Sequence, residues 1–131
     1  MQDLNYYTEQ ATTELFKKYG AFFAFGNDQF QEKMTKGVSY VHCGAGLIVP
    51  KKAVNTFIDE LDKITQTGIE KDLAENGKKA VIHRELANHE AQISMDIFDT
   101  VCALANYPIT ENEIKAEFKE FFQNCVDNDL F

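Results

Sequence analysis

In the first fifty residues the apolar side chains follow first a helical spacing and then a pattern typical of strands. They recur at three- and four-residue steps from residue 4 to residue 19, directly before a glycine, which predicts an amphipathic helix. A short apolar run at residues 21–25, an alternating segment at residues 38–43 and a second apolar run at residues 47–49 are typical of strands. A short helical turn is expected between the first two of these segments. This half of the chain therefore predicts one main helix and a small sheet of two or three strands.

From residue 50 to residue 77 the apolar spacing is helical. A clear apolar stripe covers residues 54–64. We expect Gly68 to break this helix, because glycine is a poor helix former. A shorter helix is expected to restart at Ile69 and to end at Asn76–Gly77.

The spacing over residues 78–104 fits either one long helix or two. His89 and Glu90 fall where the stripe should be apolar. We therefore favour two helices, with a joint between residues 87 and 94.

The last helix has the strongest local signals. Thr110 and Glu113 have the spacing of a capping box, and Ile109 and Ile114 occupy the positions of a hydrophobic staple. The apolar stripe then continues to Cys125. The helix is thus predicted to start next to Thr110.

Together these elements predict one α+β domain over residues 1–131, dominated by helix, with its small sheet built from the N-terminal half. No linker or internal repeat divides the chain. Aromatic side chains of the sheet are expected to pack against helical ones at Phe57, Phe98 and Phe118.

Composition narrows the class of protein. The chain has 131 residues, of which 44% are hydrophobic, and this excludes intrinsic disorder. No apolar run reaches the length of a membrane span, and the N-terminus does not resemble a signal peptide. We expect a cytoplasmic protein.

Acidic residues are concentrated in the second part of the chain. Residues 1–55 hold six basic and five acidic side chains, whereas residues 56–131 hold seven and sixteen, within a total net charge of −8. Such a field repels nucleic acid and anionic membranes, so we expect neither as a direct partner. It favours a protein partner with a basic surface. The alternative is an acidic face that only keeps the protein in solution. The candidate binding residues flank the apolar stripe of the last helix and extend into the tail: Glu111, Glu113, Glu117, Glu120, Asp127 and Asp129.

A second set of polar residues permits metal or enzyme chemistry. His83, Glu85 and His89 lie close together in a predicted helix, but their spacing matches no standard zinc motif. A metal site there requires a further ligand such as His42 from elsewhere in the fold. We favour an ion-paired helix face, with no metal and no cofactor.

Cys43 is a weak candidate for a nucleophile. His42 precedes it, and neighbouring residues on a strand point to opposite faces, so His42 is poorly placed as its base. The three cysteines form no C-x-x-C pair, which suits a reducing compartment.

Several sequence strings carry a family resemblance. They are residues 20–25 (GAFFAF), Asn27 with Gln29–Phe30, and residues 75–91 (ENGKKAVIHRELANHEA). With these strings the chain resembles a small family of uncharacterised proteins from gut-type Bacteroidetes and their phages and mobile elements, over roughly residues 20–107. The resemblance implies no activity, cofactor or site residue. It suggests only a context in which small acidic proteins block host enzymes.

We therefore expect a non-enzymatic interaction protein that inhibits a basic, nucleic-acid-handling host protein. Two alternatives stay open. One is a small metal-dependent or Cys/His enzyme that uses the region of His42, His83 and His89. The other is a homo-oligomeric structural domain that uses surplus aromatic side chains, namely Tyr6, Tyr7 and Phe131.

Overall fold

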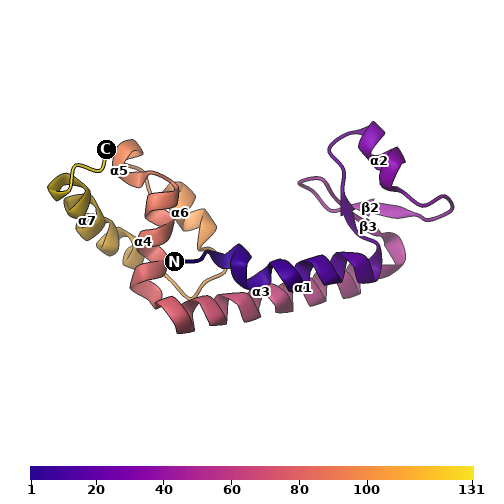
Figure 1. The fold of residues 1–131 in the computed structure, drawn as a ribbon, viewed down its shortest axis with the longest axis horizontal. Helices are drawn as coiled ribbons and strands as arrows, with labels where there is room; N and C mark the ends of the chain where they lie inside the picture. The colour runs from indigo at the N-terminus through magenta and orange to yellow at the C-terminus, as the bar shows by residue number, and fades with distance from the viewer. The chain divides into compact units, whose positions relative to one another are not determined.

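The computed structural model describes residues 1–131 and contains seven α-helices and three strands (Figure 1). The prediction of a helix-dominated α+β fold with a small sheet is confirmed. In chain order the elements are α1 (Leu4–Tyr19), β1 (Phe22–Phe23), α2 (Asn27–Lys33), β2 (Tyr40–His42), β3 (Leu47–Pro50), α3 (Val54–Asn76), α4 (Lys78–Asn88), α5 (Ala91–Ser94), α6 (Phe98–Ala103) and α7 (Glu111–Asp127), with a 3-10 turn (Lys51–Ala53) before α3.

Contacts along the chain divide it into two compact units. The sheet unit comprises Asn5–Gly68, and the helical unit comprises Met1–Leu4 together with Ile69–Phe131. Each has its own buried core, so each is described separately, and a single domain over residues 1–131 stays a prediction. No helix in either unit combines the length and apolar character that crossing a lipid bilayer requires.

The sheet of the sheet unit is antiparallel, with the strand order β1-β3-β2. Phe22 lies opposite Ile48 on one side of β3, and Val41 lies opposite Val49 on the other. The turn between β2 and β3 includes Gly46, whose φ of +81° lies in the region that glycine tolerates best. Because β3 lies between the other two strands, it is the most buried of the three, which agrees with its apolar sequence.

The core of the sheet unit joins the sheet to α1 and α3. Phe57 on α3 is fully buried, and its ring contacts that of Phe16 on α1, with ring centroids 5.4 Å apart. Leu15 and Val49 are buried in the same cluster. Lys18 on α1 also pairs with Glu60 on α3, with 3.2 Å between nitrogen and oxygen.

The prediction that Gly68 breaks a helix is wrong. α3 continues without interruption from Val54 to Asn76. Glycine in a helix interior costs only about 1 kcal/mol relative to alanine. Ile69, which follows it, is 2% exposed, and burial of such apolar positions further along the helix offsets that cost.

The helical unit is built around α4, which contacts α5, α6 and α7 (Figure 1). The predicted joint after α4 is confirmed: the helix ends at Asn88, and Glu90 and Met95 adopt left-handed conformations on either side of the short α5. The core residues of this unit are Ile69, Val81, Ile82, Leu86, Ala91, Leu104, Tyr107, Ile114, Phe121 and Cys125.

The predicted partners of the sheet aromatics are only partly right. Phe57 belongs to the core of the sheet unit, as expected. Phe118, in contrast, packs against the core of the helical unit, and Phe98 is 65% exposed. Helical spacing identified these rings as apolar positions, but it does not specify which core each one joins.

The start of α7 confirms the predicted capping box. The Thr110 side chain accepts a hydrogen bond from the Glu113 backbone N–H at 3.1 Å, and the Glu113 carboxylate accepts one from the Thr110 backbone N–H at 3.0 Å. Two backbone donors that the helix itself cannot satisfy are thus paired.

We expect Thr110→Ala to lower the free energy of unfolding by about 1 kcal/mol, because it leaves the Glu113 N–H without its acceptor. Urea denaturation followed by circular dichroism measures this loss. Thr110→Ser keeps the acceptor and is the matched control. Equal losses in the two variants would contradict the role of the cap.

Candidate functional site

The acidic residues of α7 do not form an uncompensated wall. Of the six predicted binding residues, Glu111, Glu113, Glu117 and Glu120 each lie within 4.0 Å of a basic side chain: respectively Lys115, Lys78, His83 and Lys79. The Lys78 and Lys79 partners lie on α4, directly across the helix contact. The interface between α4 and α7 is therefore lined with opposite charges.

Two of these contacts lower the pKa of the glutamate involved. The backbone N–H of Thr110, together with Lys78, holds the pKa of Glu113 below its ordinary value. Lys79 lowers the pKa of Glu120 in the same way. Both groups are ionised at neutral pH and already have a partner in the fold.

Asp127 and Asp129 differ from the four glutamates, because neither has a basic partner among the ion pairs of the structure. Asp127 accepts a hydrogen bond of 2.8 Å from the amide of Gln123, and Asp129 lies in the tail after α7 with a φ of +52°. Both are exposed. These two carboxylates can therefore meet a cation from outside the chain.

Exposed apolar side chains lie next to these aspartates. The Gln92 side chain of α5 donates a hydrogen bond of 3.0 Å to the Leu130 carbonyl, which brings α5 beside the C-terminal tail (Figure 1). We give the name C-terminal surface to the exposed residues of α5 with its two flanking residues and of the end of α7 with its tail: the apolar Ile93, Met95, Val126, Leu130 and Phe131, and the acidic Glu90, Asp127 and Asp129.

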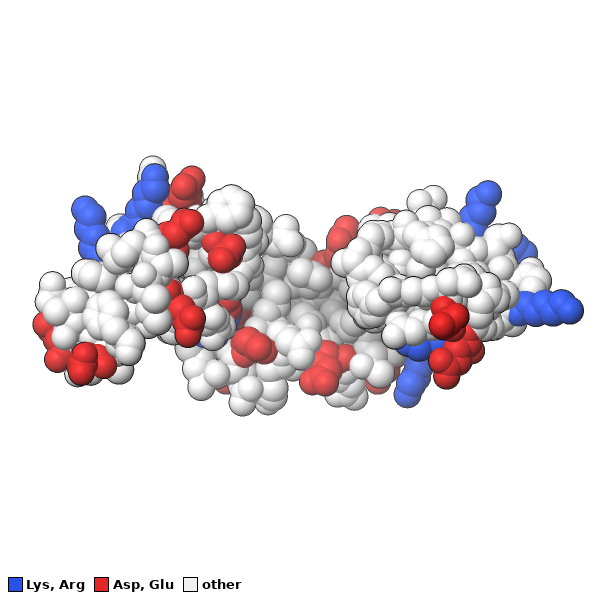
Figure 2. Space-filling model, turned by 90° about the horizontal axis from the view of Figure 1, so that it is seen from above, with Lys and Arg blue, Asp and Glu red and all other residues white.

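Net charge also separates the two units. The helical unit carries fourteen acidic and six basic side chains, a net charge of −8, whereas the sheet unit carries seven of each. On the face drawn in Figure 2, acidic side chains form small separate groups with uncharged surface between them. The helical unit as a whole therefore gives the protein a negative long-range electrostatic field. A basic partner would meet acidic side chains at only a few places on this face.

The histidines meet partners that their spacing did not reveal. His83 on α4 faces α7, where its Nε2 lies 3.6 Å from a carboxylate oxygen of Glu117, and Glu120 completes the group. Both glutamates had been predicted as partner-binding residues only. Their separation of three residues, which places them on one helix face, is the signal that could have joined them to His83.

The other proposed metal ligands lie elsewhere. His89 pairs only with Glu85, one turn away on the same helix, at 3.6 Å. Glu85 also accepts a hydrogen bond from Arg84 at 2.9 Å. His42 lies on β2 in the sheet unit, where its ring stacks on Phe30 with centroids 5.7 Å apart. The Cys43 thiol is half-buried and contacts the Val41 carbonyl.

Asp72, on α3, is one of the sixteen acidic residues in the second part of the chain, but it adds nothing to the surface charge, because it is fully buried. Its carboxylate receives two hydrogen bonds from the Arg84 guanidinium at 2.8 and 3.0 Å, one from the Tyr107 hydroxyl at 2.5 Å and one from the Asn76 amide at 2.8 Å. Burial raises the pKa of Asp72, but these donors outweigh it and leave that pKa below its ordinary value.

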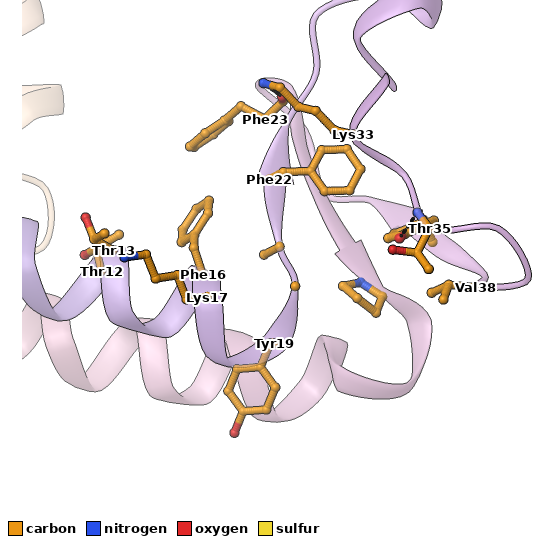
Figure 3. Close-up of a pocket in the computed structure, with 14 residues that line it drawn as sticks. Thr12, Thr13, Phe16, Lys17, Tyr19, Phe22, Phe23, Lys33, Thr35 and Val38 are labelled. Carbon is orange, nitrogen blue, oxygen red and sulfur yellow. Dashed lines mark hydrogen bonds between the residues drawn. The ribbon is translucent and has the colours of Figure 1, made fainter. Parts of the chain in front are cut away.

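A surface pocket of about 750 Å³ lies in the sheet unit (Figure 3). Phe16, Phe22 and Phe23 contribute rings to its wall, and Lys33 donates a hydrogen bond of 2.7 Å to the Phe23 carbonyl. The lining contains no carboxylate, imidazole or thiol. The pocket can hold an apolar group, and its titratable side chains are two lysines and two tyrosines, Lys17, Lys33, Tyr19 and Tyr40.

Comparison with protein families gives one assignment. A family model described as a family of unknown function, DUF7659, matches residues 4–125, nearly the whole chain. The chain belongs to the DUF7659 family. Comparison of this DUF7659 chain with curated proteins and with solved structures gave no match. The assignment agrees with the expected membership of an uncharacterised family and adds no activity.

Proposed function

We propose that this protein is a non-enzymatic interaction protein that binds a basic amphipathic segment of a protein partner at its C-terminal surface. The observation that carries the proposal is the joint exposure of apolar side chains and unpaired carboxylates at that surface, within a unit of net charge −8. Leu130 and Phe131 are 50% and 62% exposed.

The two parts of the surface have different tasks. Exposed apolar side chains supply most of the binding free energy when a partner covers them. Carboxylates such as Asp127 and Asp129 select basic over acidic partners, and the net charge of the helical unit raises the rate of encounter. The four glutamates of α7 add to this long-range attraction, although three of them pair with lysines of the same unit.

The target that we propose is a basic, nucleic-acid-handling protein in the cytoplasm of a bacterial host. The resemblance to proteins of Bacteroidetes phages and mobile elements supports this context. Binding at a basic groove of such a protein would exclude its nucleic-acid substrate, which gives the interaction an inhibitory effect.

A peptide titration tests the binding surface. The probe is a fluorescent helical peptide with leucine on one face and lysine on the other, and its matched control carries glutamate in place of lysine. We expect the lysine peptide alone to bind, and its dissociation constant to increase steeply between about 50 and 300 mM NaCl, because salt screens exposed charges. Equal binding of the two peptides, or a salt-independent dissociation constant, would refute the proposal.

Substitutions locate the site. Asp127→Lys combined with Asp129→Asn removes the two unpaired carboxylates, and we expect it to weaken binding of the lysine peptide about fivefold to tenfold at low salt. Glu32→Lys with Asp28→Asn makes the same change of charge on α2 and is the matched control. If both double variants weaken binding equally, net charge alone accounts for the affinity and the C-terminal surface has no special role.

A further inference from the structure

Two buried polar atoms on facing helices have no hydrogen-bond partner. They are Nε2 of His83 on α4 and Oε2 of Glu117 on α7, and they lie 3.6 Å apart. A buried polar atom without a partner destabilises the fold, because it has lost its hydrogen bonds to water. Because the two atoms lie this close together, a single ligand bound to both would satisfy both.

The spacing of these atoms fits a metal better than a hydrogen bond. A hydrogen bond between nitrogen and oxygen requires about 2.7–3.2 Å. Two ligand atoms that bind one tetrahedral Zn²⁺ at about 2.1 Å lie about 3.4 Å from each other. The observed 3.6 Å is close to this second value.

Glu120 supplies a third ligand. One ligand atom from each of His83, Glu117 and Glu120 lies within 4.8 Å of the others. The His83 ring is held edge-on against Phe121, with centroids 5.9 Å apart, so its orientation is set by the core of the helical unit. Three ligands on two packed helices leave a position for water or a further donor, as in many zinc sites.

Lys79 competes for the same carboxylate. Its amine lies 2.8 Å from Oε1 of Glu120, and the pair is exposed. The Lys79 ammonium would therefore repel a cation bound at Glu120 and compete with it for the carboxylate. Removal of Lys79 should therefore increase the affinity of this site for a cation. In an ordinary ion-pair network, removal of one member only weakens the network.

We propose that His83, Glu117 and Glu120 form a binding site for a divalent transition metal of the Zn²⁺ class. One imidazole and two carboxylates suit Zn²⁺ and Co²⁺, whereas Ca²⁺ and Mg²⁺ prefer oxygen ligands alone. The site lies between α4 and α7 and is independent of the C-terminal surface proposed for partner binding.

The test is calorimetric titration of protein without an affinity tag with Zn²⁺, followed by Co²⁺ absorption spectroscopy. We expect one equivalent of Zn²⁺ to bind, and the Co²⁺ spectrum to show d–d bands without thiolate charge transfer, since no cysteine is a ligand. His83→Ala should abolish this binding. Glu117→Gln, which is nearly isosteric and preserves the fold, should weaken it at least about tenfold, since loss of a ligand or its support typically has this effect.

Two further variants separate this site from an adventitious one. His89 also lies 3.6 Å from a glutamate on α4, but it has no second carboxylate, so His89→Ala is the matched control and should retain full affinity. Lys79→Gln should increase the affinity up to about fivefold, the equivalent of one exposed ion pair. Unchanged affinity in Glu117→Gln, equal losses in the His83 and His89 variants, or weaker binding in Lys79→Gln would each overturn the proposal.

Discussion

Asp72→Ala is expected to lower the free energy of unfolding by about 3–5 kcal/mol, because it removes the fully buried carboxylate of the Arg84 ion pair and leaves the guanidinium paired with Glu85 alone. The Arg84 side chain is only 8% exposed, and two of its three hydrogen-bonding nitrogens donate to Asp72. The Tyr107 hydroxyl and the Asn76 amide lose the same acceptor. A single truncation thus leaves several donors unpaired in the interior of the helical unit.

Urea denaturation at neutral pH measures this loss, and Asp127→Ala is the matched control. Asp127 is exposed, so its truncation should change the free energy of unfolding by less than about 0.5 kcal/mol. Tyr107→Phe removes one donor and leaves the pair of Asp72 with Arg84 intact, so its loss should be intermediate. A loss below about 1 kcal/mol for Asp72→Ala would mean that water enters the network freely and that the pair is not a buried one.

The same pair makes stability depend on pH with a definite sign. The pKa of Asp72 is lower in the folded protein than its ordinary value. Its contribution is therefore fully present above about pH 4, where the unfolded chain also has an ionised aspartate, and is lost as the pH falls through the lower folded pKa. Asp72→Ala should show a smaller loss of stability over that acid range than the wild type does.

Local signals in the sequence were sufficient to predict most of the helices. The cap at Thr110 and Glu113 is local, and so is the apolar stripe that follows, so the start of α7 could be read directly. Gly68 shows the opposite case, in which a local signal is overridden by burial of residues further along the helix, such as Ile69. Propensity is a weak prior wherever packing is strong.

Pairings across long stretches of chain could not be read from the sequence. Asp72 is buried because Arg84 and Tyr107, 12 and 35 residues away, bring donors to it. Likewise, Glu120 counts toward the net charge, but its partner Lys79 lies 41 residues away. A sequence gives the number of charges, whereas the fold decides which of them face one another. The sequence therefore did not show that the α7 glutamates lie beside basic side chains of the fold, nor that two of them group with His83.

Phe57→Ala, in the sheet unit, is expected to lower the free energy of unfolding by about 3–5 kcal/mol, the usual range for truncation of a buried phenylalanine. The Phe57 ring is fully buried and makes edge contacts with Phe16 and Tyr19, with centroids 5.4 and 6.3 Å away. Alanine leaves a cavity between α1, α3 and the sheet, and it removes both aromatic contacts.

Ile58→Ala is the matched control, because Ile58 is the next residue of α3 and is 40% exposed, so its truncation should cost less than about 1 kcal/mol. Chemical denaturation gives both losses, and amide hydrogen exchange shows where they occur. Because α3 runs through both units, we expect Phe57→Ala to lower the protection of Val49 in the sheet unit and of Leu86 in the helical unit together, as a single cooperative domain requires. Loss of protection at Val49 alone would show that the two cores unfold separately, and the prediction of one domain would then be wrong even though both cores form as described.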